Sequence, residues 1–187
     1  MSLAWHAIHD SLLHSSRTLT FQRHFDLMRR NSSPLVAFRD PAALLDALHR
    51  QSASPDEKND CLRALVREAQ GTAPVSDTAL TVLLLALWPG LDALWRRSLG
   101  LRLGTTADII SDILARATET LRGLDLDRVN RIAATVLQNI QRDMIRDIRQ
   151  QTQRQPDAQP PHGWRHGLQQ GCVKTRAQQQ PQRHRPD

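Results

Sequence analysis

Apolar residues recur along much of the chain at intervals of three and four positions, the period of an amphipathic helix. The clearest run lies within residues 127–150 and places its apolar side chains on one side of the helix: Val129, Ile132, Ala133, Val136, Leu137, Ile140, Met144 and Ile148. That side must be buried. Asp127 is the predicted N-cap, and Arg146 and Arg149 stand near the C-terminal end, where the helix dipole favours cations.

The opposite side of this helix is polar and rich in arginine. It carries Arg131, Gln138, Arg142 and Arg149 at heptad-like spacing, interleaved with Asn139, Asp143, Arg146 and Gln150. Guanidinium and amide groups are the donors that phosphates and base edges accept. The alternative interpretation is a solvated face on which Arg142 and Arg146 pair with neighbouring aspartates, Asp143 and Asp147.

A second helix is predicted directly before this one, and the two join at Gly123. Thr105 or Thr106 caps it, and its apolar side is formed by Ile109, Ile110, Ile113, Leu114, Ala117 and Leu121. Its outer side is acidic and contains Asp108, Ser111, Asp112 and Glu119. An acidic helix followed by a basic one either offers two different surfaces or neutralises itself across one surface.

The most apolar element is residues 77–88, in which leucines cover most of a helix circumference, as expected for a helix in the middle of a bundle. Pro89 and Gly90 are expected to bend or interrupt it before the period continues to Gly100. Trp88 and Trp95 are a heptad apart and are predicted to pack on the same side, in the core. Further helices are predicted after Asp40 and from Pro55.

These patterns predict an all-α protein, a single multi-helix bundle with a disordered C-terminal tail. We expect weakly docked N-terminal helices at 1–30, a helical hairpin at 34–74 that is a candidate accessory module, and a helical bundle at 77–150. Residues 151–187 are rich in Gln, Pro, Arg and His and nearly lack aliphatic residues, so they cannot bury enough apolar surface to order themselves. This tail holds six basic and two acidic residues.

The chain is basic overall, with 25 Lys and Arg against 19 Asp and Glu. Only Lys58 and Lys174 are lysine, so nearly all the basic residues are arginine. This balance suits an anionic partner, most often nucleic acid, although a GC-rich genome also replaces lysine with arginine.

Several function classes find no support in the sequence. Cys61 and Cys172 form no disulfide framework or metal knuckle, which fits a reducing cytoplasm, and the spacing of His6, His9 and His14 predicts no metal site. The apolar run before Pro89 is shorter than the roughly 20 residues of a membrane span. Without a Gly-rich phosphate loop, a carboxylate pair or a Ser/His/Asp arrangement, we expect no enzyme activity, cofactor or small-molecule substrate.

Two segments carry a family resemblance. Residues 106–112 (TADIISD) are similar to the acidic helix Ala-Glu-Asp-Leu-Val-Gln-Glu of bacterial RNA polymerase sigma factors, and residues 136–146 (VLQNIQRDMIR) are similar to that family's next helix. The stretch thus resembles the second conserved region of these factors, particularly the extracytoplasmic-function type. No counterpart of the family's fourth conserved region follows Gln150, and the chain contains no Tyr.

The resemblance implies a sigma-like, cytoplasmic transcription protein with DNA and RNA polymerase as partners. Its acidic helix, with Asp108, Ser111 and Asp112, would bind the clamp region of core polymerase. The residues predicted to face DNA are Arg131, Gln138, Asn139, Arg142, Arg146 and Arg149. The alternative is a helical protein-protein interaction module, anti-sigma-like or an accessory protein of a mobile element, in which the arginines bind an acidic protein and no DNA.

Overall fold

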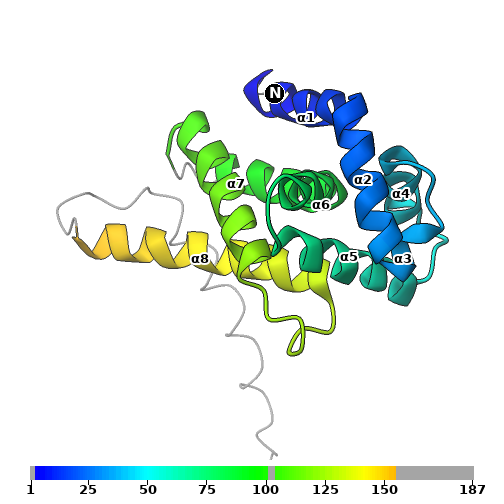
Figure 1. Ribbon diagram of the computed structural model, residues 1–187. Coiled ribbons are helices and arrows are strands. Elements are labelled where there is room, and N and C mark those ends of the chain that lie inside the picture. The colour runs from blue at the N-terminus through cyan, green and yellow to red at the C-terminus, as the bar shows by residue number, and fades with distance from the viewer. Residues whose placement is uncertain (1–2, 101–103, 155–187) are drawn as a thin grey trace, which may run out of the picture. The chain divides into compact units, whose positions relative to one another are not determined.

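The computed structural model describes residues 3–100 and 104–154, which form eight α-helices and no strand (Figure 1). The helices are α1 (Leu3–Ser16), α2 (Leu19–Asn31), α3 (Ser33–Val36), α4 (Pro41–His49), α5 (Pro55–Ala69), α6 (Val75–Gly100), α7 (Thr106–Arg122) and α8 (Ile132–Arg154). The predicted all-α class is confirmed. One compact unit ends at Ile148, and of the unit that follows only the last turns of α8 are described. Most of the predicted tail therefore lies outside the described residues.

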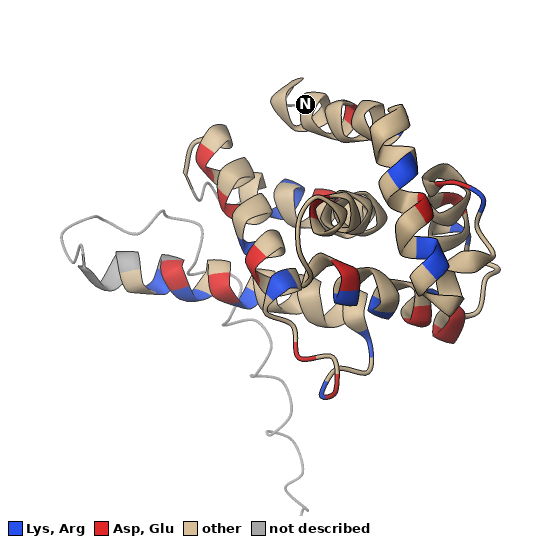
Figure 2. Cartoon of the chain, in the orientation of Figure 1, with Lys and Arg blue, Asp and Glu red and all other residues tan. Residues whose placement is uncertain are grey.

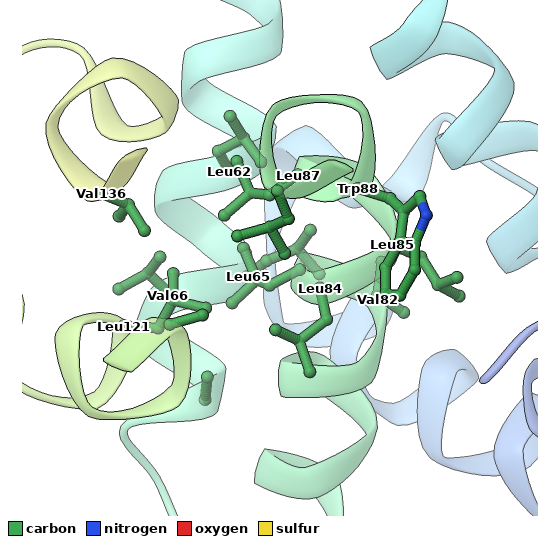
Figure 3. Packing of buried hydrophobic residues seen from close by; sticks show 14 of the residues in the cluster. Leu62, Leu65, Val66, Val82, Leu84, Leu85, Leu87, Trp88, Leu121 and Val136 are labelled. Atoms are coloured by element: carbon green, nitrogen blue, oxygen red, sulfur yellow. The ribbon is translucent and has the colours of Figure 1, made fainter. Parts of the chain in front are cut away.

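Helix α6 lies at the centre of the first unit. Helices α1, α2, α4, α5 and α7 all pack against it, and Figure 1 shows it nearly end-on among them. Figure 3 shows its leucines meeting Leu65 and Val66 of α5, Leu121 of α7 and Val136 of α8. The side chains that α6 buries point in all directions around its axis, as its continuous apolar sequence predicts.

Pro89 does not interrupt α6, which continues through it for 26 residues. Proline removes one backbone donor, and this loss is tolerated because Pro89 is exposed while Trp88 and Leu91 hold both flanks in the core. The uninterrupted helix has the length and composition of a membrane-crossing helix, and 56% of its most apolar window is buried inside the fold. Packing against five other helices accounts for that composition.

The N-terminal helices are anchored by large buried side chains. The Trp5 ring stacks on Trp88, with 4.4 Å between ring centroids, and on Trp95 at 5.6 Å. Its Nε1 donates a hydrogen bond of 3.0 Å to the Asp92 carboxylate. Helix α2 adds three buried residues one turn apart: Phe21, Phe25 and Met28. The loose apolar period of this region predicted weak docking, because a single deeply inserted tryptophan leaves no periodic signal.

Residues 34–74 share the core of the first unit with the helices that follow. Cys61, Leu62 and Leu65 of α5 are buried, and α5 packs against both α6 and α7. Two predicted helix starts are confirmed: Asp40 Oδ1 accepts the Ala43 backbone N–H at 2.7 Å, and Thr105 forms a capping box with Asp108.

The docking of α1 is testable through Trp5. Replacing Trp5→Ala removes a fully buried indole and both ring stacks, so we expect a loss of about 3–5 kcal/mol of unfolding free energy in chemical denaturation. Leu3→Ala is the matched control, because Leu3 lies on the same helix with 90% of its surface exposed. A Trp5→Ala variant as stable as the Leu3→Ala variant would show that α1 is only loosely held.

Candidate nucleic-acid interface

Helix α8 is amphipathic, as its sequence predicts. Its buried side is formed by Ile132, Val136, Ile140 and Met144, and Ala133 and Leu137 are half-buried beside them. The side chain of Ile148 lies outside the described residues. Burial of this side leaves the arginine-rich side of α8 facing solvent.

The start of α8 differs from the prediction. The helix begins at Ile132, and Asp127 is not its N-cap, because Asp127 lies in the preceding turn, where its backbone N–H donates to Asp125 Oδ1. The first-turn N–H of Ile132 instead donates to Asn59 Oδ1 of α5 at 3.0 Å. A cap supplied by another helix, 73 residues away in sequence, leaves no local signal.

Two further side chains of α5 hold the connector between α7 and α8. Arg63 donates through Nη1 to the Leu126 carbonyl and through Nη2 to the Val129 carbonyl, the latter at 2.8 Å. Gln70 Nε2 donates to the carbonyls of Leu121 and Leu124, at 3.3 and 2.8 Å. These bonds satisfy carbonyls at the end of α7 and in the turn, so α5 determines where α8 begins.

The middle of α8 approaches the backbone of α6 closely at Gly90. A Cβ atom at this position would lie within 2.9 Å of Leu137 Cδ2 and collide with the other Leu137 methyl group. Only glycine leaves this space free within a helix, at a cost in helix propensity of about 1 kcal/mol relative to alanine. Gly90, expected from the sequence to mark a bend, therefore accommodates α8.

An ion-pair network joins α7 to α8. Arg116, with only 19% of its side chain exposed, contacts Asp112 Oδ1 through Nε at 2.8 Å and Asp147 Oδ2 through Nη2 at 2.5 Å. The hydrogen bond to Asp112, together with that to Asp147, raises the pKa of Arg116 above its ordinary value. Asp147 is thereby directed to α7 and does not pair with the arginines of α8, contrary to the second of the two interpretations of the sequence.

Five of the six predicted DNA-facing residues are exposed, and Asn139 is half-buried. Arg146 forms an ion pair with Asp143 at 2.5 Å, whereas the Arg142 guanidinium reaches only the Asn139 side-chain oxygen, at 3.5 Å. Arg131 and Arg149 pair with no carboxylate among the described residues. Figure 2 shows blue and red residues alternating along α8. The solvated-face interpretation thus holds for Arg146, and three arginines keep an unpaired charge.

The acidic residues predicted to bind a partner lie on the first turns of α7. Asp108 is exposed, but its Oδ2 accepts the Thr105 hydroxyl at 2.6 Å and the Thr105 backbone N–H at 3.3 Å. Asp112 is committed to Arg116, and Ser111 is exposed. Both carboxylates therefore already have intramolecular partners, which reduces the negative charge that this end of α7 offers to another molecule.

A hollow of about 410 Å³ opens beside the start of α8. Leu62 and Leu87 contribute apolar surface to it, while Lys58, Asn130 and Arg131 contribute polar groups. Arg131 is the only predicted DNA-facing residue that lines this hollow. The sequence predicted no cavity here, because its walls come from four separate parts of the chain.

The described residues offer little for catalysis or metal binding. Within residues 3–100 and 104–154, no group of three or more His, Cys, Asp or Glu side chains is placed to hold a metal ion. Cys61 is buried, and this burial, with the charges of Asp60 and Glu57, raises the pKa of its thiol. The protonated thiol is a weak nucleophile, consistent with a packing role.

Comparison of the chain with family models, with curated proteins and with solved structures finds no match. The likeness to sigma factors therefore rests on the residues of α7 and α8 themselves.

The dependence of α8 on α5 is testable with Arg63→Ala. Because this change leaves the Leu126 and Val129 carbonyls without their donor, we expect a loss of about 1–3 kcal/mol in stability. Amide hydrogen exchange in the first turn of α8 should also become faster. Arg67→Ala, which removes an exposed arginine one turn along α5, is the control and should change neither quantity. Unaltered exchange at 132–136 in Arg63→Ala would contradict this role.

Proposed function

We propose that this protein is a non-enzymatic, sigma-like DNA-binding protein that contacts DNA through the outer side of α8. The observation that supports this best is that Arg131, Arg142 and Arg149 are exposed and unpaired with any carboxylate among the described residues. An unpaired guanidinium neutralises a phosphate and releases condensed counterions without first breaking an ion pair. These three positions therefore supply most of the binding free energy.

The remaining polar residues of α8 have different roles. Gln138 is exposed and carries the amide donor and acceptor that recognise adenine edges, so it contributes to base discrimination. Arg146 brings Asp143 with it, and the carboxylate offsets much of its attraction to phosphate. From Arg131 to Arg149 the helix extends about 27 Å at 1.5 Å per residue, somewhat less than one turn of duplex DNA.

Stacking of bases on aromatic side chains has no support in the described residues. Trp5, Trp88, Trp95, Phe21 and Phe25 are all buried, and Ile132 and Leu114 stand where the related factors usually carry an aromatic residue. Stacking adds roughly 1–3 kcal/mol per base in single-strand binders. The proposal is therefore for backbone and groove contacts, with a strong dependence on salt.

Docking on RNA polymerase through the start of α7 is the second part of the proposal, and it places the protein in the cytoplasm. Asp108 and Ser111 are exposed there, and a basic partner must compete with Arg116 for Asp112. Such competition weakens the docking relative to an acidic helix whose carboxylates are free.

A helical protein-protein interaction module without DNA binding is the alternative. The mixed charges along α8 support it, because the Arg146–Asp143 pair suits a protein surface of mixed charge better than a polyphosphate. Affinity purification from nuclease-treated lysate separates the two. Polymerase subunits are recovered if the sigma-like proposal is correct, and a single acidic protein without polymerase is recovered if the alternative is correct.

DNA binding is expected to weaken when the unpaired arginines are removed. The double variant Arg131→Ala/Arg142→Ala should bind duplex DNA at least about tenfold more weakly at low salt, and the slope of log affinity against log salt should fall by about 1.8. Arg146→Ala should have a smaller effect because its charge is already offset by Asp143. Gel-shift titrations at several salt concentrations measure both quantities.

The matched control is Arg23→Ala, which removes an exposed arginine of α2 that has no carboxylate partner in the described part of the chain. It should leave DNA affinity unchanged, and circular dichroism should show that every variant remains helical. Equal affinities of the wild type and the α8 double variant at low salt would refute DNA binding through α8.

Polymerase docking is tested separately with Ser111→Arg. A positive charge placed between Asp108 and Asp112 should abolish recovery of polymerase subunits and leave the DNA affinity of the isolated protein unreduced. Ser111→Ala, which removes the hydroxyl without adding charge, should retain recovery. Undiminished recovery with Ser111→Arg would show that this end of α7 is not the docking surface.

A further inference from the structure

Helix α2 carries a second basic surface, unrelated to α8. Phe21, Phe25 and Met28 fill its buried side, and four residues at intervals of four, four and three follow the opposite side: Leu19, Arg23, Leu27 and Arg30. All four are exposed, with 67% of Leu19 and 48% of Leu27 accessible to solvent. We call this set the α2 stripe.

The α2 stripe is positively charged. Within the described residues, neither Arg23 nor Arg30 has a carboxylate partner, and the one acidic residue of α2, Asp26, pairs with Arg29 at 2.9 Å. Arg17, exposed just before the helix, adds a further cation. The charged residues of α2 are mostly blue in Figure 2. A surface of this charge attracts an anionic partner.

The two leucines indicate what kind of anionic partner fits. Phosphates gain nothing from leucine, so a nucleic acid would leave half of the α2 stripe unused. Insertion into a lipid surface requires a wide apolar face, and the apolar face of α2 is already occupied by the protein core. Alternating apolar and cationic positions along three turns instead match a helix with alternating apolar and acidic positions.

We propose that the α2 stripe is a docking surface for an acidic amphipathic helix of another protein. Leu19 and Leu27 pack against the apolar residues of that helix, while Arg23 and Arg30 pair with its carboxylates. From Leu19 to Arg30 the α2 stripe is about 16 Å long, which corresponds to three turns of the partner helix. This surface is independent of the DNA contacts assigned to α8.

The test uses the full chain and a synthetic peptide of about 18 residues, long enough to form a helix, with leucine and glutamate at positions that share one helical side. A scrambled peptide of the same composition is the control ligand. Fluorescence anisotropy should show the patterned peptide binding at least about tenfold more tightly than the scrambled one. Equal binding of the two peptides would mean that charge alone is recognised and would overturn the proposal.

Variants locate the binding on α2. Leu19→Ser/Leu27→Ser and Arg23→Glu/Arg30→Glu should each weaken binding of the patterned peptide about tenfold or more. A peptide with lysine in place of glutamate should bind Arg23→Glu/Arg30→Glu more tightly than it binds the wild type. The matched control, Arg131→Ala/Arg142→Ala, should leave peptide affinity unchanged, and an equal loss in this control would overturn the assignment to α2.

Two competitors test the other anionic partners. Vesicles of phosphatidylserine and phosphatidylcholine, and a duplex DNA, should bind the wild type and the Leu19→Ser/Leu27→Ser variant equally, since neither uses the leucines. A loss of vesicle or DNA binding in that variant, larger than its loss of peptide binding, would overturn the proposal in favour of a lipid or nucleic-acid surface.

Discussion

Burial of α6 on every side is the constraint on which the rest of the structure depends. A helix of 26 residues with leucines around most of its circumference is stable in water only when other helices cover all of it. Helices α1, α2, α4, α5 and α7 do so, and α8 adds a contact at Gly90. Each covering helix buries one side and presents the other to solvent, so the functional surfaces are the outer sides of helices whose inner sides cover α6.

The position of α8 depends on polar contacts as well as on burial. Asn59 and Arg63 of α5 fix its start, Gly90 of α6 permits its close approach, and Arg116 of α7 ties its later turns to Asp147. A buried or half-buried polar group must find a partner on folding, which makes such contacts directional where apolar packing is not. They hold the outer side of α8 in one orientation relative to the rest of the first unit.

Internal ion pairs determine which charges remain available to a partner. Asp112 and Asp147 are both committed to Arg116, and Asp143 to Arg146, while Arg142 keeps only a long contact with an amide. The same selection operates on α2, where Asp26 pairs with Arg29 and leaves Arg23 and Arg30 unpaired. The net charge of +6 says little about where positive charge is free. The pairing pattern locates it on the outer sides of α8 and α2.

The sequence by itself determined the helical class, the central place of α6, the buried side of α8 and two of its neighbours' N-caps. These features follow from local chemistry, because a period of 3.6 residues and a capping side chain act over a few residues. The tertiary structure alone decided the firm docking of α1 through Trp5, the start of α8 at Ile132 and the partners of Asp112 and Asp147. Each of these depends on groups brought together from distant parts of the chain, and a periodic pattern holds no information about which distant side chain will lie opposite.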